Sequence, residues 1–146
     1  MSARAGQCMC GEVRFTAQNV PQEFGTCHCK MCQRWLGSAF LGVTIAEKNL
    51  SWQGEDNIAT LQSSGWAERA WCSKCGTGLW YRVTADGPLN GNYEIPIGIF
   101  DDAEGFKMTR EIFIDRKPDA FAFQGEHELL TEAQVFALYG PTTEGA

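Results

Sequence analysis

The sequence predicts a mostly antiparallel all-β domain with a short C-terminal helix, and three observations support this. Apolar residues recur in short stretches with the period-two alternation of strands. Clusters of Gly, Asn, Asp and Pro separate these stretches, and sixteen glycines in 146 residues favour a turn-rich chain. We therefore expect a single domain over residues 1–146, with a core of about 7–140 and a disordered tail at 141–146.

Seven stretches have the composition expected of strands. They are Glu12–Ala17, Ser38–Ile45, Ile58–Gln62, Glu68–Cys72, Gly78–Val83, Tyr93–Ile99 and Glu111–Ile114. Turn signals separate several of them, for example at residues 54–57, 85–88, 90–92 and 101–102. Short strands with turns between them are typical of antiparallel sheets.

Two segments are predicted to be helical. The first is a turn or two around Lys30–Leu36, ended by Gly37. The second begins at Thr131, where Thr-Glu-Ala-Gln matches a capping box with Gln134 at the third helical position, and it ends at Gly140 before a proline. We expect this terminal helix to pack three apolar side chains on the sheet: Val135, Phe136 and Leu138.

The charge and hydropathy of the chain argue against several classes of partner. Twelve basic and eighteen acidic side chains give a formal charge of −6, and a four-cysteine zinc site would add about two more negative charges. Nucleic acids and anionic membranes are therefore not expected as partners. No apolar run reaches the roughly 18 residues of a membrane span, and the first residues lack the apolar core of a signal peptide. We expect a cytoplasmic protein.

Seven cysteines dominate the functional interpretation. Their odd number and the expected reducing compartment disfavour a disulfide scaffold and favour metal binding. They form three groups along the chain: Cys8 with Cys10; Cys27, Cys29 and Cys32; and Cys72 with Cys75. Thiols one or two residues apart on a tight turn supply half of a tetrahedral zinc shell.

The glycines that follow two of these groups indicate how the cysteines combine. Gly11 follows Cys10 and Gly76 follows Cys75, and a residue with positive φ lets backbone N–H groups turn back toward the sulfurs. We therefore predict one closed structural zinc site that uses four ligands: Cys8, Cys10, Cys72 and Cys75. A rival pairing joins Cys29 and Cys32 with Cys72 and Cys75 as a zinc ribbon, although the 39 intervening residues exceed the usual spacing of roughly 15–20.

The remaining triad, Cys27, Cys29 and Cys32, can hold a second zinc through three sulfurs. Three protein ligands leave a fourth position for water or substrate, which is typical of catalytic zinc. An all-sulfur shell favours exchange with another soft thiolate, so we expect a thiol substrate. The alternative is a second structural site completed by His28 or His127. Otherwise His127 is expected to be a solvated residue without a role.

Basic residues beside the cysteines are candidates for contact with an anionic substrate. Lys30 and Arg34 lie close to the triad in sequence, and Lys74 lies between Cys72 and Cys75. Each could offset thiolate charge or hold a substrate carboxylate. Solvated surface charge is the alternative for each. No residue outside the triad is identifiable as a general acid or base.

The cysteine pattern resembles the family of glutathione-dependent formaldehyde-activating enzymes, whose domain also occurs in centromere protein V. The matching segments span about residues 7–123 and are Cys8–Phe15, Cys27–Arg34, Gly37–Phe40, Trp71–Gly76 and Glu111–Pro118. The resemblance implies tent-like β sheets around a ribbon-type zinc, and the same two ligand sets as above. It also implies a carbon–sulfur lyase that joins formaldehyde and glutathione reversibly. Gln33 departs from the basic residue that many members carry there.

Two other classes of function stay open from the sequence. One is a protein-binding module in which both zincs, two per chain, are structural. The other is a thiol redox enzyme, which would have no cysteine left once all seven are ligands. The sequence does not determine the oligomeric state, the natural thiol or the natural aldehyde.

Overall fold

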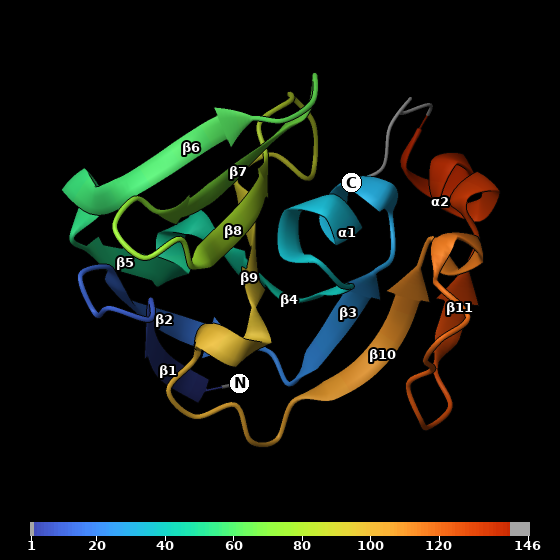
Figure 1. Ribbon diagram of the computed structural model, residues 1–146, viewed down its shortest axis with the longest axis horizontal. Helices are drawn as coiled ribbons and strands as arrows, with labels where there is room; N and C mark the ends of the chain where they lie inside the picture. The colour runs from blue at the N-terminus through green and yellow to red at the C-terminus, as the bar shows by residue number, and fades with distance from the viewer. Residues whose placement is uncertain (1, 141–146) are drawn as a thin grey trace. The chain divides into compact units, whose positions relative to one another are not determined.

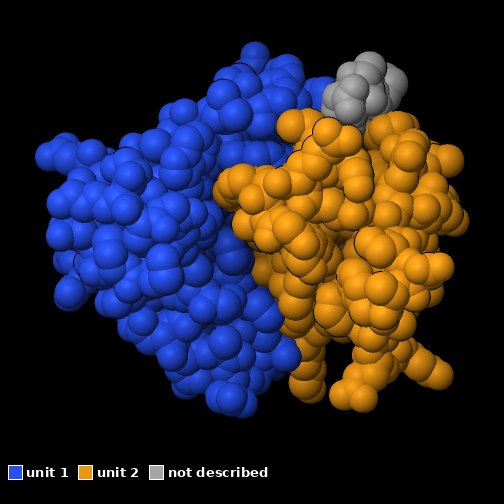
Figure 2. All heavy atoms as spheres, in the orientation of Figure 1, with its two compact units in different colours: residues 1–22, 43–106 blue, residues 23–42, 107–146 orange. Residues whose placement is uncertain are grey.

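A computed structural model describes residues 2–140, which form eleven strands and two α-helices (Figure 1). The described residues divide into two compact units (Figure 2). The first unit contains residues 2–22 and 43–106, and the second contains residues 23–42 and 107–140. No helix among residues 2–140 has the length and apolar character needed to cross a bilayer.

The first unit is made almost entirely of antiparallel strands. One sheet has the order β1-β2-β5, and the strands β6 to β9 follow one another as neighbours. Their bounds are β1 Ser2–Gln7, β2 Arg14–Val20, β5 Leu50–Gln53, β6 Ile58–Gln62, β7 Ala67–Cys72, β8 Gly78–Val83 and β9 Asn92–Pro96. Phe15 of β2 is fully buried and its ring packs against Trp52, which also contacts Trp80 of β8. Aromatic packing therefore joins the two groups of strands.

The second unit combines parallel and antiparallel pairing. Its β10 runs parallel to both β3 and β11, side by side in Figure 1, while β3 pairs antiparallel with the first residues of β4. The bounds are β3 Glu23–Cys27, β4 Phe40–Ala46, β10 Lys107–Ile112 and β11 Glu128–Leu130, with helices α1 Lys30–Leu36 and α2 Glu132–Tyr139. The division between the units falls within β4. Because β3 and β10 are far apart in sequence, this unit depends on a long-range pairing.

Four short 3₁₀ turns connect the strands. They cover Glu47–Asn49, Glu55–Asn57, Ile97–Ile99 and Ile114–Arg116. Two of them lie where the sequence predicted the ends of strands. The stretch predicted as Tyr93–Ile99 is a strand only to Pro96, and the stretch predicted as Glu111–Ile114 is a strand only to Ile112.

The predicted fold class is confirmed: the chain is mostly β with a short C-terminal helix. Both helices have the predicted positions, with Gly37 in the left-handed conformation after α1 and a complete capping box at Thr131 and Gln134. The prediction for Leu138 is wrong, since it is 61% exposed while Val135 is buried. The predicted tail at 141–146 lies outside the described residues, and the single domain stays a prediction.

Candidate metal centres

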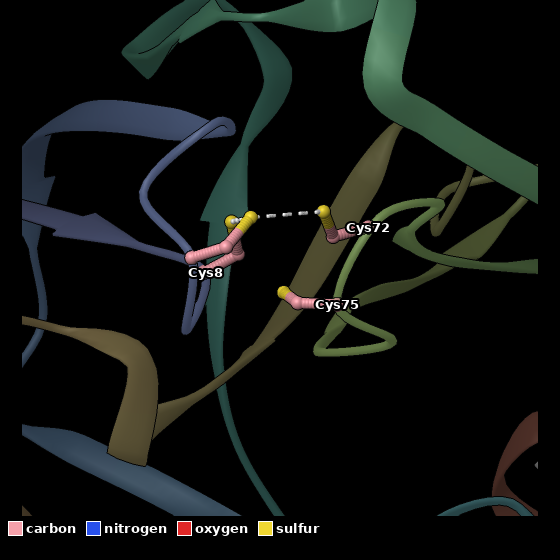
Figure 3. A group of neighbouring side chains, drawn as sticks. Cys8, Cys72 and Cys75 are labelled. Atoms are coloured by element: carbon pink, nitrogen blue, oxygen red, sulfur yellow. Dashed lines mark hydrogen bonds between the residues drawn. The ribbon is translucent and has the colours of Figure 1, made fainter.

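The structure gathers the first four predicted ligands into one cluster. The sulfurs of Cys8, Cys10, Cys72 and Cys75 all lie within 4.8 Å of one another, and Figure 3 shows three of these side chains turned toward a common point. Cys8 and Cys10 lie on the turn after β1, Cys72 ends β7, and Cys75 lies on the turn before β8. Two chain segments more than sixty residues apart therefore meet at these four thiols.

The two glycines predicted to shape these turns do so. Gly11 has φ of 80° and Gly76 has φ of 81°, a backbone region that favours glycine. In the first turn the N–H of Val13 donates to the Cys8 sulfur at 3.3 Å. In the second turn the N–H of Gly76 donates to the carbonyl of Cys72 at 2.8 Å. The two turns thus share a glycine with positive φ, and the thiols they carry lie within 4.8 Å of one another.

The spacing of the sulfurs fits a tetrahedral metal site. The sulfur of Cys10 lies 3.6 Å from that of Cys8 and 3.8 Å from that of Cys72. Four sulfurs about 2.3 Å from a central zinc would be about 3.8 Å apart along the edges of the tetrahedron. The donor set and its geometry therefore suit zinc.

The thiols of Cys75 and Cys10 differ in pKa. Hydrogen bonds from the side chain and backbone of Thr77 lower the pKa of Cys75 to about 5. The backbone hydrogen bond with Glu12 lowers the pKa of Cys10, but the loss of surrounding water and the neighbouring thiols outweigh it and raise that pKa to about 12. The thiolate is the form that binds metal, and the low pKa of Cys75 favours that form at neutral pH.

The second cluster consists of the predicted triad. The sulfurs of Cys27, Cys29 and Cys32 lie within 4.8 Å of one another and all three residues are buried. Cys27 ends β3, Cys29 is the N-cap of α1, and Cys32 lies in the first turn of that helix. Backbone N–H groups point at the sulfurs, from Cys29 to Cys27 at 3.5 Å and from Cys32 to Cys29 at 3.3 Å. The end of β3 and the first turn of α1 therefore bring the three thiols together.

Burial and crowding raise the pKa of the Cys27 thiol. Loss of water raises its pKa well above the ordinary value, and the thiols of Cys29 and Cys32 raise it further. Three thiols this close favour a cation that would replace their protons. Within residues 2–140, no histidine or carboxylate joins the three sulfurs as a fourth member of the cluster. The donor set is therefore three sulfurs and leaves one tetrahedral position for another ligand.

The two histidines contact a carboxylate that the sequence analysis did not identify. Nε2 of His28 lies 2.6 Å from one oxygen of Glu111, and Nε2 of His127 contacts the other oxygen. The prediction that His127 is solvated is wrong, because its side chain is only 4% exposed. Burial tends to raise the pKa of Glu111, but the hydrogen bonds from His127 and His28 lower it below its ordinary value. A carboxylate only accepts, so each imidazole donates from Nε2.

Glu111 gave no clear signal in the sequence. Alternation along the strand Lys107–Ile112 places Glu111 on the same side as Lys107 and Thr109, which are exposed, so the pattern suggests a solvent-facing carboxylate. Glu111 is nevertheless buried, and a buried charge needs a partner because leaving it unpaired is costly. The identity of that partner depends on the parallel pairing of β10 with β3, which the sequence did not reveal.

The predicted basic residues have different settings. Lys30 and Arg34 are exposed on α1, one helical turn apart. Lys74 is also exposed, and its ammonium lies 3.7 Å from the carboxylate of Glu12. The rival zinc ribbon would combine Cys29 and Cys32 with Cys72 and Cys75. Among the described residues, these two pairs belong to different cysteine clusters.

Comparison with known proteins places these clusters in context. Residues 3–116 match the family described as glutathione-dependent formaldehyde-activating enzyme. An uncharacterized lyase of Schizosaccharomyces pombe is 30% identical over 132 residues, which cover 89% of this chain and 92% of the relative. A Halomonas elongata protein provisionally named as a glutathione-dependent formaldehyde-activating enzyme is 32% identical over 87 residues, covering 51% and 53% respectively. A Rhodobacter sphaeroides crystal structure shares the fold, with a TM-score of 0.55, 22% identity and coverage of 66% and 87%.

Proposed function

The chain belongs to the family of glutathione-dependent formaldehyde-activating enzymes, and from that premise we propose that it is a zinc-dependent carbon–sulfur lyase. Its substrate would be a thiol–aldehyde adduct such as S-hydroxymethylglutathione. The observation that carries the proposal is the buried group of three thiols, Cys27, Cys29 and Cys32, without a fourth protein ligand among the described residues.

The first cluster would hold a structural zinc. Four sulfurs complete a tetrahedral shell and leave no position for a substrate. The shell joins the turn after β1 to the end of β7, so the metal would act as a cross-link between distant parts of the first unit. Structural zinc of this kind contributes on the order of 10 kcal/mol to folding in small domains.

The second cluster would hold the zinc at which the substrate reacts. Zinc bound there would stabilise the thiolate of the substrate at the remaining position. The sulfur–carbon bond of the adduct breaks, its electron pair stays on sulfur, the hydroxyl proton is released, and a carbonyl bond forms. Because the products are a thiol and an aldehyde, the reaction consumes no oxidant or reductant. Nothing in this scheme assigns a general acid or base.

The exposed cations of α1 are proposed to bind the carboxylates of the thiol. Lys30 and Arg34 lie on the helix whose N-cap is Cys29, so they are close to the triad in the chain. Charge-assisted hydrogen bonds from these side chains would favour a peptide thiol over an uncharged one. We expect Arg34→Gln to raise KM for glutathione severalfold while leaving KM for 2-mercaptoethanol, which has no carboxylate, unchanged.

Zinc content and exchange kinetics test the proposal together. We expect about two zincs per purified wild-type chain, one in a folded Cys29→Ser variant, and loss of folding in Cys72→Ser. The exchange of ¹³C-formaldehyde with its glutathione adduct can be followed by NMR. Wild type should accelerate this exchange over the spontaneous rate, and Cys29→Ser should not.

Two results would contradict the proposal. One is a wild-type protein with two zincs that leaves the exchange rate unchanged for every thiol and aldehyde tried. The other is a Cys29→Ser variant that unfolds as completely as Cys72→Ser, because the triad would then be structural.

A further inference from the structure

His28, the residue between the first two sulfurs of the triad, is held at three of its four polar groups. Its N–H donates to the carbonyl of Ile112 at 3.0 Å, and its carbonyl accepts from Nε2 of Gln33 at 2.7 Å. Its ring donates from Nε2 to Glu111 at 2.6 Å, and the whole residue is 0% exposed. The backbone that joins Cys27 to Cys29 is therefore fixed by contacts with β10 and α1.

Glu111 is the centre of a buried three-residue network. Parallel pairing aligns Glu111 with Thr26 and Ile112 with Cys27, so the carboxylate lies beside the end of β3. One oxygen accepts from His28 and the other from His127, whose side chain is also nearly fully buried. Phe121 and Phe123 lie against the His28 ring, with centroids 6.0 Å away in each case. Burying these polar groups is costly unless they are hydrogen-bonded, and the contacts of Glu111 with the two rings supply those bonds.

The network is not a third metal site. Binding one metal would require both imidazole nitrogens and a carboxylate oxygen to lie close to one another. The described groups of three or more ligand atoms within 4.8 Å are the two cysteine clusters, and the residues of this network form no such group. The carboxylate instead bridges the two rings through separate oxygens.

We propose that Glu111 is a positioning residue for the cysteine triad, acting through His28 and itself held in place by His127. By fixing the His28 ring it fixes the Cys27–Cys29 backbone, and so aims the sulfurs at a common point before metal arrives. Hydrogen-bonded groups behind metal ligands have this effect in other sites, where their loss typically weakens metal binding by ten- to hundredfold. The inference rests on the proposed function, because it takes the triad to be the second zinc site.

The test measures the two clusters in the same molecule. Glu111→Gln should reduce zinc affinity at the triad by about ten- to hundredfold, measured by competition with a chelator, and should change the Co²⁺ spectrum of that site. The Cys29→Ser variant supplies the spectrum of the first cluster alone for subtraction. Affinity at the first cluster should be unchanged. Glu132→Gln is the matched control, because Glu132 is a surface carboxylate in the same unit, paired with Arg116.

A second pair of variants keeps the test decisive where Glu111→Gln fails to fold. His127→Gln retains an N–H donor near the position of Nε2 and should leave the triad close to wild type. His127→Leu removes the donor and should weaken the triad. Unchanged triad affinity and spectrum in Glu111→Gln, or in His127→Leu where Glu111→Gln does not fold, would overturn the proposal, as would equal weakening of both clusters. A wild-type protein that binds a single zinc would instead overturn the proposed function.

Discussion

At the scale of single residues, Thr77 serves both halves of the first cysteine cluster. Its hydroxyl oxygen accepts from the N–H of Met9 at 2.9 Å, and its hydroxyl lies 3.2 Å from the sulfur of Cys75. Met9 stands between Cys8 and Cys10, so one side chain ties the first turn to the second. The low pKa of Cys75, about 5, comes mainly from this residue.

Replacing Thr77 by valine should therefore weaken the first cluster. The substitution keeps the branched shape but removes the hydroxyl, so the pKa of Cys75 should rise and the N–H of Met9 should lose its partner. A hydrogen bond to a charged group is worth about 1.5–3 kcal/mol, which corresponds to at least a tenfold loss of zinc affinity. Chelator competition measures it, and Thr77→Ser is the control that retains the hydroxyl. Equal affinity in Thr77→Val and wild type would show that the contact is unimportant.

Glu111 makes the stability of the protein depend on pH. The pKa of Glu111 is lowered from 4.5 in the folded protein, because hydrogen bonds from His127 and His28 outweigh the effect of burial. Its contribution is therefore present above pH 4.5 and is lost as pH falls through the lower folded value. The gap in unfolding free energy between wild type and Glu111→Gln should shrink as pH falls below 4.5. Urea unfolding at saturating zinc measures this, and a gap that widens in acid would contradict it.

At the scale of secondary-structure elements, local signals set both helices and several turns. Gly54, in the turn between β5 and β6, has φ of 80°, and a Cβ there would lie 1.9 Å from the carbonyl oxygen of Glu12. Gly37, which ends α1, has φ of 76°, and a Cβ there would meet nothing within 4 Å. The two positions share a conformation but differ in the space available.

This difference predicts unequal effects of alanine at the two glycines. Gly37→Ala should cost about 1–2 kcal/mol, the usual penalty of the left-handed conformation. Gly54→Ala carries the same penalty and also collides with the backbone, so it should destabilise the first unit several times more strongly. Thermal unfolding of the two variants side by side checks this. Similar melting temperatures for both would mean that the turn at Gly54 relaxes freely.

The same elements show what could be predicted from the sequence. The helices at 30–36 and 132–139 depend on capping residues and glycines within a few positions, so their signals are complete in the local sequence. The strands β1, β3, β5 and β11 were not predicted, because short or polar strands such as β1, with one buried residue, are defined by their pairing partners. The parallel pairing of β10 was missed for the same reason.

The candidate sites show the same contrast between features set by local sequence and features set by long-range pairing. The cysteine groups are recognisable because metal ligands repeat at short spacing beside glycines. Glu111 and His127 gave no comparable signal, since their meeting with His28 depends on a pairing across more than eighty residues. Leu138 illustrates the opposite error, because helical spacing alone assigned it to the packed face.

At the scale of the whole molecule, each compact unit contains one cysteine cluster. Cys8, Cys10, Cys72 and Cys75 belong to the first unit, and the triad belongs to the second. Removing the ligands of one cluster should therefore change the amide protection of different residues than removing the ligands of the other.

Hydrogen exchange measured by mass spectrometry should resolve these changes. Cys72→Ser, which is expected to unfold, should lose amide protection throughout residues 2–140, because the four-sulfur site joins distant segments of the first unit. Cys29→Ser should lose protection mainly around residues 27–36, since the other hydrogen bonds of the second unit remain. Global loss of protection in Cys29→Ser would contradict the separate roles of the two clusters.

The discontinuous second unit has a consequence for the order in which the protein is made. The three thiols of the triad lie within six residues and leave the ribosome together, whereas Glu111 follows about 80 residues later. At about 5–20 residues per second, the interval is on the order of 4–16 s. During this time the nascent chain presents three neighbouring thiols without β10 beside them. The proposed positioning of the triad by Glu111 would therefore begin only when β10 pairs with β3.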